Sequence, residues 1–470
     1  MLFCSLTFLW VFLPAVLLAS RLLPRAWQNA LLLAASLFFY AWGGPKYLLL
    51  MLASITLNWA GGFAIAAFPP GSHPRRMALA AFLAANLGLL GWFKYYGFFA
   101  GILRRLPGLG GIPALDIALP IGISFYTFQA MSYLIDLYRG RIALQKNWFL
   151  LALYISFFPQ LIAGPIVQYA RVERQLAGRE VTAQNAAFGV KRFCWGLAKK
   201  VILANAFAAR ADEIYALDPA AASTALAWLG ALYYTLQIYY DFSGYSDMAI
   251  GLGELFGFHF PENFNYPYLA ASVTEFWRRW HMTLSGWFRE YLYIPLGGSR
   301  RGTARTLANL LLVFLVTGLW HGASWQFVAW GAWYGLLLAA ERLFLLKGLR
   351  RLPAALGRLY TLFWVMGGWV LFRAPGLRAA AGWLRAMLLP AAGSGAWPAL
   401  RYLDGRMALL LAAGLLLCGP LQAALPRLKT ALYTREAPGP AQTAALLAAL
   451  AWCLVLLVCG TYNPFIYFRF

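Results

Sequence analysis

Long apolar runs recur along the whole 470-residue chain, and they constrain the possible fold more than any other feature. A helix that crosses the hydrocarbon layer of a bilayer needs roughly 20 mainly apolar residues. The runs that could cross the bilayer, or enter it in part, lie near 2–20, 30–43, 46–67, 77–102, 117–137, 147–167, 186–208, 223–240, 305–321, 325–346, 356–373, 405–425 and 441–460. The sequence therefore predicts an all-α, polytopic integral membrane protein.

The composition excludes a soluble multidomain enzyme. Hydrophobic residues make up 62% of the chain and charged residues 12%, whereas about a quarter of a soluble domain is charged. No stretch outside the apolar runs is long and mixed enough to form a core of its own. We therefore expect one transmembrane domain over residues 1–470.

The net charge of +23 would also suit a nucleic-acid-binding protein. The basic residues, however, lie in what the apolar pattern predicts to be short loops, where an excess of positive charge marks the cytoplasmic side. Examples are Arg171, Arg174, Arg179, Lys191, Arg192, Lys199 and Lys200. We therefore expect a bilayer environment and no nucleic-acid partner.

The start of the chain predicts an uncleaved first helix with its N-terminus outside. The run 2–20 has no basic residue before it and is followed by Arg21 and Arg25, so it lacks the charged start of a signal peptide. The five cysteines are odd in number and form no CxxC pair. Neither a disulfide framework nor a metal site is indicated.

Polar residues concentrate between positions 241 and 290, where six of the 16 acidic residues and two of the four histidines lie. Polar groups at membrane depth are costly unless they line a cavity or a water-filled path. Function is therefore expected here and in what packs against this region. Within it, the spacing of large apolar side chains predicts one amphipathic helix over 273–293, lying along the membrane surface.

His321 is the leading candidate for catalysis. It lies sixteen residues after Arg305, which places it about 24 Å along a helix at a rise of about 1.5 Å per residue. An imidazole at that depth should be neutral and able to act as a general base. Gly318, Gly322 and Ala323 are small and leave room for a substrate or a close helix. The alternative is a histidine that only bonds across helices.

Two further candidates have structural alternatives. His281 lies at the margin of the amphipathic stripe, and by spacing alone an interfacial histidine is the favoured interpretation. Tyr467 lies in the final segment FIYFRF, where the favoured interpretation is an aromatic belt at the bilayer interface. A nucleophilic tyrosine would need an adjacent base, because a phenol is mostly protonated at neutral pH. No sequence motif of the common soluble hydrolases, metalloproteases or nucleotide-binding proteins is present.

Several motifs together resemble the membrane-bound O-acyltransferase family, in particular its bacterial branch that O-acetylates alginate and peptidoglycan. They are LPIGISFY (119–126), LIAGP (161–165), YDFSGYSDMAIG (240–251), ENFN (262–265), TEFWRRWH (274–281) and GLWHGA (318–323). The likeness covers most of residues 1–345. The remainder matches by hydropathy and by the tail at 461–470, which is similar to the end of a small membrane partner in teichoic acid D-alanylation.

The resemblance implies that His321 is the catalytic histidine and that His281 occupies a second, upstream polar position. It implies tilted helices around a central tunnel, with a cytoplasmic mouth for acyl-CoA and an outer opening for the acceptor. By the same likeness, Tyr467 is a candidate acyl carrier. Basic residues near the cytoplasmic mouth would hold the phosphates of acetyl-CoA, the acyl-donor substrate. They are Arg278, Arg279, Arg300 and Arg301.

The expected protein is thus a multi-pass enzyme of the bacterial inner membrane that moves acetyl from cytosolic acetyl-CoA toward an extracytoplasmic polysaccharide, such as an alginate-like polymer or peptidoglycan. Because no large outer domain is present to bind polymer, a periplasmic acetyltransferase partner is expected. Two alternatives stay open: a transporter without covalent chemistry, and a family member that acylates a lipid or a protein hydroxyl.

Overall fold

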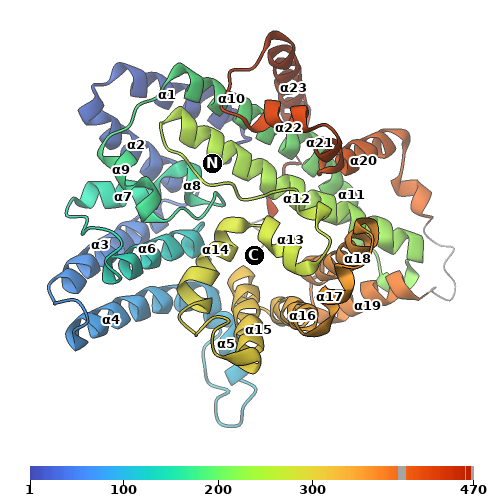
Figure 1. The fold of residues 1–470 in the computed structure, drawn as a ribbon, viewed down its shortest axis with the longest axis horizontal. Coiled ribbons are helices and arrows are strands. Elements are labelled where there is room, and N and C mark those ends of the chain that lie inside the picture. The colour runs from blue at the N-terminus through green and yellow to red at the C-terminus, as the bar shows by residue number, and fades with distance from the viewer. Residues whose placement is uncertain (390–397, 461, 467–470) are drawn as a thin grey trace. The chain divides into compact units, whose positions relative to one another are not determined.

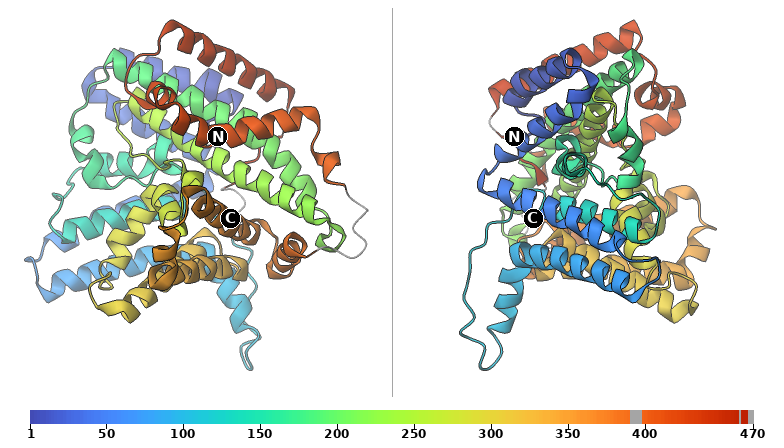
Figure 2. Two further views of the ribbon diagram at one scale, coloured as in Figure 1. Left: turned by 45° about the vertical axis from the view of Figure 1, so that its right-hand side comes forward. Right: turned by 90° about the vertical axis from the view of Figure 1, so that its left-hand side faces the viewer.

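The computed structural model describes residues 1–389, 398–460 and 462–466, and every regular element in these ranges is a helix (Figures 1 and 2). The all-α prediction is confirmed. The chain forms two compact units. The first contains residues 1–193 and 248–261, and the second contains residues 194–247 and 262–470. A single transmembrane domain over the whole chain stays a prediction.

The first unit contains the N-terminal helices. They are η1 (Phe8–Phe12), α1 (Leu13–Leu22), α2 (Arg25–Ala41), α3 (Lys46–Ala66), α4 (His73–Leu90), η2 (Gly91–Tyr95), α5 (Tyr96–Leu103), α6 (Ile123–Tyr138), α7 (Trp148–Ser156), α8 (Phe158–Leu161), α9 (Tyr169–Ala177) and most of α10 (Ala183–Ala198). Helices α3, α4 and α6 lie side by side (Figure 1; right-hand view of Figure 2). Asn58 on α3 and Asn86 on α4 exchange side-chain hydrogen bonds of 3.1 and 2.9 Å in a buried setting. This reciprocal pair satisfies polar groups that would otherwise be costly to bury.

The second unit begins at the end of α10. It contains η3 (Lys199–Ala204), α11 (Asn205–Tyr215), η4 (Pro219–Ala221), most of α12 (Thr224–Leu255), η5 (Pro267–Leu269), α13 (Val273–Arg279), α14 (Met282–Phe288), η6 (Arg289–Tyr293), α15 (Gly302–His321), α16 (Trp325–Ala340), η7 (Glu341–Leu345), α17 (Leu346–Leu349), α18 (Ala354–Arg373), α19 (Leu377–Leu388), η8 (Ala399–Tyr402), α20 (Gly405–Leu417), α21 (Pro420–Ala424), α22 (Pro426–Tyr433) and α23 (Pro440–Cys459). α12 continues into the first unit at its C-terminal end.

Five helical stretches among the described residues are long and apolar enough to cross a membrane. They are 46–66, 73–103, 302–321, 354–373 and 440–459, with shorter apolar helices at 8–22 and 405–417. Other apolar runs fold differently. The run expected at 147–167 breaks at Phe157 between α7 and α8, and the run expected at 117–137 becomes helical only at Ile123. An apolar run in this chain is therefore not always one crossing.

α15 and α16 form a closely packed helical hairpin. At Gly318 on α15, a Cβ atom would collide with the backbone carbonyl of Phe327, and at Gly331 on α16 it would collide with that of Phe314. Small residues at such crossings let two backbones approach closely. The expectation that Gly318 leaves room for a close helix is confirmed, and this contact fixes the end of α15 that carries His321.

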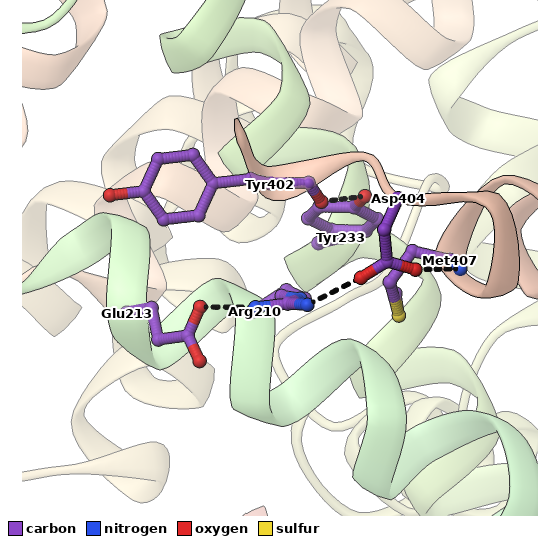
Figure 3. A network of polar contacts seen from close by, with 6 residues as sticks. All are labelled: Arg210, Glu213, Tyr233, Tyr402, Asp404 and Met407. Atoms are coloured by element: carbon purple, nitrogen blue, oxygen red, sulfur yellow. Dashed lines mark hydrogen bonds and ion pairs between the residues drawn. The ribbon is translucent and has the colours of Figure 1, made fainter. Parts of the chain in front are cut away.

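A polar network ties the segment before α20 to α11 and α12 (Figure 3). The guanidinium of Arg210 on α11 donates to Glu213 at 2.8 Å and to Asp404 at 2.7 Å. The hydroxyl of Tyr233 on α12 donates to the carbonyl oxygen of Tyr402 at 2.8 Å. The chain beyond residue 398 is thus joined to the second unit by directed bonds as well as by apolar packing.

The prediction that the basic residues between 171 and 200 lie in loops is wrong for most of them. Arg171 and Arg174 lie on α9, and four residues are buried inside helices: Lys191, Arg192, Lys199 and Lys200. Buried charges need partners, so these residues are structural parts of the interior rather than surface markers of the cytoplasmic side.

Candidate active site

His321 is the last residue of α15 and is 9% exposed. Its ring meets the rings of Trp330 on α16 and Phe372 on α18 edge to face, with centroids 5.1 Å away in both cases. Trp320 contacts it at 5.0 Å. The carbonyl-rich C-terminal end of α15 can stabilise an imidazolium that forms during a reaction. The site therefore suits a group that takes up a proton and gives it back.

A small cavity of about 10 Å³ lies beside His321, which is room for about one water molecule. Its wall combines side chains from α12, α16, α18, the α13–α14 junction and the C-terminal tail. The lining residues are Ile238, Phe242, Trp280, His321, Trp330, Trp369, Phe372 and Ile466. All of them belong to the second unit. His321 is thus the titratable group of this cavity, and the implied tunnel with its two mouths stays a prediction.

His281 lies at a helix break, which corrects the prediction of one continuous helix over 273–293. α13 ends at Arg279, α14 begins at Met282, and His281 between them has the left-handed backbone angles φ 43° and ψ 53°. Left-handed geometry is uncommon for residues other than glycine and costs of the order of 1–3 kcal/mol. The spacing of large apolar residues predicted one helix because it continues on both sides of the break, and no glycine lies at the break to indicate it.

His281 is 1% exposed, so it is not an interfacial histidine. Its ring contacts Phe242, a lining residue of the cavity, at 4.6 Å, and Trp320 at 6.3 Å. Burial, and secondarily the charge of the nearby His321, lowers the pKa of His281 well below its usual value. The two histidines are therefore neighbours in the second unit, and His281 is neutral at physiological pH.

Asn263 fixes the ring of His281. Its side-chain Oδ1 lies 3.0 Å from His281 Nδ1 and also accepts hydrogen bonds from the backbone N–H and the hydroxyl of Thr283, at 3.2 and 2.9 Å. Because the backbone N–H of Thr283 can only donate, the shared atom is an oxygen, and His281 Nδ1 must carry the hydrogen. Nε2 then has a free lone pair, and no described residue forms a hydrogen bond with it. No sequence pattern marked Asn263 as the residue that orients this ring.

Glu341 is a second residue that sequence analysis missed. It is fully buried at the start of η7, and its two carboxylate oxygens accept hydrogen bonds from the backbone N–H groups of Val273 and Thr274 at 2.7 and 2.8 Å. The hydroxyl of Thr274 adds a bond of 2.6 Å. A carboxylate at a helix N-terminus satisfies free N–H groups and the helix dipole. The sequence could have indicated this role, because Glu341 is a lone acidic residue inside an apolar run.

Asp241 and Asp247 on α12 form buried ion pairs. Lys199 contacts Asp247 at 2.7 Å, and Lys200 contacts Asp241 at 2.6 Å. α12 is a continuous helix, and the main partners of both aspartates are lysines. Asp241 also accepts the backbone N–H of Ile466 at 2.8 Å, so a backbone partner is present as well. Two adjacent lysines on η3 thus each meet an aspartate of α12.

The described part of the C-terminal tail is bound inside the second unit. Lys200 also donates to the carbonyl of Pro464, and Asn205 donates to the side chain of Asn463 at 3.1 Å. Phe465 and Ile466 are buried, with the ring of Phe465 at 4.8 Å from that of Tyr245. A lipid-facing aromatic belt does not describe these two residues. Tyr467 itself lies outside the described residues.

The four arginines expected at a coenzyme mouth differ in their surroundings. Arg279 forms an ion pair with Glu275 at 2.6 Å, one helical turn away. Arg278, Arg300 and Arg301 are exposed and form no ion pair with any described residue. A turn follows residue 293, with Gly297 and Gly298 at positive φ. Three of the four guanidinium groups are thus open to an anionic ligand.

No group of three or more histidine, cysteine or acidic side chains in the described part of the chain is placed to hold a metal ion. The chemistry available at this site is that of two imidazoles, one bare Nε2 lone pair and a largely aromatic wall. Proton transfer from a hydroxyl group to a neutral imidazole is within its reach.

Comparison with known proteins agrees with these features. The model of the family described as MBOAT, membrane-bound O-acyltransferase, matches residues 147–372. The probable alginate O-acetylase AlgI of Azotobacter vinelandii is 45% identical over 381 residues, which cover 80% of this chain and 76% of that protein. The peptidoglycan O-acetyltransferase of Helicobacter pylori is 38% identical over 424 residues, covering 83% and 80%. The teichoic acid D-alanyltransferase of Bacillus subtilis is 29% identical over 238 residues, covering 48% and 59%.

Proposed function

Because the chain belongs to the membrane-bound O-acyltransferase family and is a multi-pass membrane O-acyltransferase, we propose that it transfers acetyl from cytosolic acetyl-CoA toward an extracytoplasmic polysaccharide across the bacterial inner membrane. The acceptor polymer is alginate-like or a peptidoglycan, as the names of two relatives with high coverage suggest. The observation that carries the proposal is His321, buried against aromatic rings at the end of an apolar helix and beside a cavity.

His321 acts as the general base in this proposal. The neutral imidazole takes the proton of an attacking hydroxyl, the hydroxyl oxygen forms an ester bond to the acetyl carbonyl carbon, and the carbon–sulfur bond of the thioester breaks. The imidazolium then returns its proton to the leaving thiolate. General-base catalysis contributes roughly 10²- to 10⁴-fold. The C-terminal end of α15 favours the transient imidazolium.

His281 acts as a second acceptor in the same reaction. With Nδ1–H engaged by Asn263, the ring can offer only its Nε2 lone pair. It can hold a hydroxyl or thiol proton, but it cannot donate to a developing oxyanion. We therefore assign one of two roles to His281. It orients the attacking hydroxyl, or it accepts the hydroxyl proton after His321 has taken it up.

The coenzyme phosphates are held by basic residues of the segment 278–301. Exposed guanidinium groups without a carboxylate partner bind phosphate strongly through paired N–H donors. Arg278, Arg300 and Arg301 meet this description. Arg279 is the weaker candidate of the four, because Glu275 already neutralises it.

Tyr467 carries the acetyl group in transit. The preceding residue, Ile466, lines the cavity that contains His321, and its backbone is held by Asp241. A tyrosyl ester remains reactive because a phenolate is a better leaving group than an alkoxide, so the acetyl group can be passed on to a periplasmic acetyltransferase or to the sugar. His321 can act as the general base whether or not Tyr467 carries the acetyl group.

The test is hydrolysis of acetyl-CoA and transfer of its acetyl group by the detergent-purified protein. His321→Ala should lower turnover at least about 100-fold, whereas the matched control His73→Ala, at an exposed histidine, should not. Both variants should keep the melting temperature of the parent within a few degrees. Unchanged turnover in a folded His321→Ala protein would remove the histidine from the mechanism, whereas no turnover by the parent protein would favour a transporter without covalent chemistry.

The acyl-carrier step has its own experiment. After incubation with acetyl-CoA, mass spectrometry of the C-terminal peptide should show one added acetyl group, and Tyr467→Phe should abolish both this adduct and transfer to polymer. An unmodified peptide together with full activity of Tyr467→Phe would contradict the carrier role and leave His321 unaffected. Added periplasmic partner should raise polymer acetylation, and full activity of the purified chain alone would show that no partner is needed.

A further inference from the structure

The first unit contains a polar cavity of about 210 Å³, formed by the end of α1, the start of α2, the segment after α9 and the end of α12. Three arginines and one glutamate line it: Arg21, Arg25, Arg179 and Glu180. The proposed acyl transfer uses none of these residues. The volume is sufficient for a phosphate group together with several waters.

Arg179 is a rigid part of the cavity wall. Its Nε donates to the carbonyl of Phe256 at 2.7 Å, and its Nη1 donates to the side-chain oxygen of Asn29 at 2.6 Å. The guanidinium also stacks at 4.4 Å on the ring of Phe258. These partners come from α2 and from the chain around the end of α12, so they fix the position of the guanidinium. The Arg179 side chain therefore loses less conformational entropy when a ligand binds.

The partners of Arg179 are all neutral. No described carboxylate forms an ion pair with it, although Glu180 is the next residue. Glu180 pairs instead with Arg25, at 3.0 Å. Burial without a counter-ion lowers the pKa of Arg179 to about 10. An anion in the cavity would supply the missing negative charge.

The cavity as a whole has an excess of positive charge. Of its three arginines, Glu180 compensates one, so the lining charge is +3 − 1 = +2. Arg21 is exposed and forms no ion pair among the described residues. Two uncompensated guanidinium groups facing one cavity are suited to bidentate recognition of phosphate.

The neighbouring side chains favour a lipid as the source of that phosphate. Leu22, directly after Arg21, is 75% exposed, and Trp27 on the first turn of α2 is 64% exposed. Apolar and tryptophan side chains beside basic residues are typical of the membrane–water interface. Basic pockets at this level between helices bind anionic headgroups.

We propose that this cavity binds a phosphate group, supplied by the headgroup of an anionic phospholipid, through Arg21, Arg25 and Arg179. A soluble phosphate compound would offer the same chemistry, and the two sources are separated by experiment. The bound headgroup would neutralise the excess charge and join α1, α2 and the segment after α9 at one point. The residues of this site all belong to the first unit, whereas those that line the cavity beside His321 all belong to the second.

Native mass spectrometry of the detergent-purified protein with added phosphatidylglycerol tests the proposal. The parent protein should bind phosphatidylglycerol more tightly than phosphatidylcholine, and Arg21→Gln with Arg25→Gln should weaken that binding about tenfold or more. The matched control is Arg76→Gln with Arg105→Gln, which removes the same charge from exposed positions of the same unit. The control should bind as the parent does.

Titration with inorganic phosphate forms the second arm. The parent protein could bind phosphate saturably, lose this binding in the Arg21/Arg25 variant and show no preference for phosphatidylglycerol. That result would assign the same residues to a site for a soluble phosphate compound. Equal losses in both double variants, or equal binding of phosphatidylcholine and phosphatidylglycerol with no phosphate binding, would overturn the proposal. Arg21 and Arg25 are exposed, so their variants remain informative even if Arg179→Gln fails to fold.

Discussion

His281 Nδ1 donates a hydrogen bond to Oδ1 of Asn263, and this one bond decides which nitrogen of the ring is free to act. The two residues lie eighteen positions apart in the sequence, and both are buried. Met282 donates its backbone N–H to the carbonyl of Asn263 at 2.9 Å, so the backbone and the side chain of Asn263 hold the same helix break. The ring of His281 is therefore oriented by Asn263 rather than by a position within a helix.

Asn263→Ala should lower acetyl transfer about tenfold or more and leave the KM for acetyl-CoA nearly unchanged. The variant frees His281 Nδ1, so the ring can turn and change tautomer. Asn263→Asp should restore much of the activity, because a carboxylate oxygen also accepts from Nδ1–H. The control is Asn265→Ala at an exposed position. Steady-state kinetics of the four proteins test this, and full activity of a folded Asn263→Ala protein would refute the positioning role.

The Lys200–Asp241 pair should behave as a coupled unit. Asp241→Asn alone leaves a buried lysine without its counter-ion, which typically costs about 3–5 kcal/mol. Combining it with Lys200→Met should be less destabilising than the sum of the single changes. Thermal unfolding of the double-mutant cycle measures the coupling.

The exposed pair of Arg210 and Glu213 serves as the comparison for that cycle. Glu213→Gln should change stability by less than about 1 kcal/mol. Because Asp241 and Lys200 also bind Ile466 and Pro464, Asp241→Asn should make the tail more accessible to carboxypeptidase. Strictly additive cycle energies, with no change in digestion, would contradict the coupling.

Glu341→Gln should destabilise the protein by about 1–3 kcal/mol, because a charge-assisted acceptor of two backbone N–H groups and a hydroxyl becomes a neutral amide. Glu341→Leu should cost more, since it leaves the N–H groups of α13 without an acceptor. The melting temperatures of the two variants and of the exposed control Glu436→Gln provide the measurement. Melting temperatures of the Leu and Gln variants equal to that of the parent protein would show that the carboxylate does not cap α13.

The stability of the folded protein should fall below about pH 6.5 through His281. Its pKa in the folded state is lowered, so the unfolded chain binds the proton first. The contribution of the neutral ring is thus fully present above the unfolded pKa of about 6.5 and declines as the pH falls, by up to about 1.4 kcal/mol per pH unit. His281→Gln should flatten the melting temperature between pH 6.5 and 5, whereas His73→Gln should not. Parallel curves for the parent and His281→Gln would exclude this titration.

The helical class and the position of His321 were predictable because both depend on local sequence. An apolar run of membrane length defines α15, and counting residues along it places His321 at its C-terminal end. The partners of buried charges were not predictable in the same way. Lys200 meets Asp241 across 41 positions of sequence, and Glu341 meets Thr274 across 67. Such pairs follow from packing, which hydropathy does not encode.

The helix break at His281 was also beyond the sequence pattern. The spacing of apolar residues indicates which side chains share one face of a helix. This spacing continues on both sides of Trp280, although the residues before it belong to α13 and those after it to α14. The termination of α13 depends on contacts of the carbonyl and side chain of Asn263, which lie outside the periodic segment.

In the proposed mechanism, the left-handed backbone of His281 makes activity depend on temperature. The strain at this residue is relieved by any local opening that lets φ return to negative values, and the same rotation carries the imidazole away from Asn263 and Phe242. Warming should therefore lower the activity of the enzyme before its helices unfold, and cooling should restore that activity.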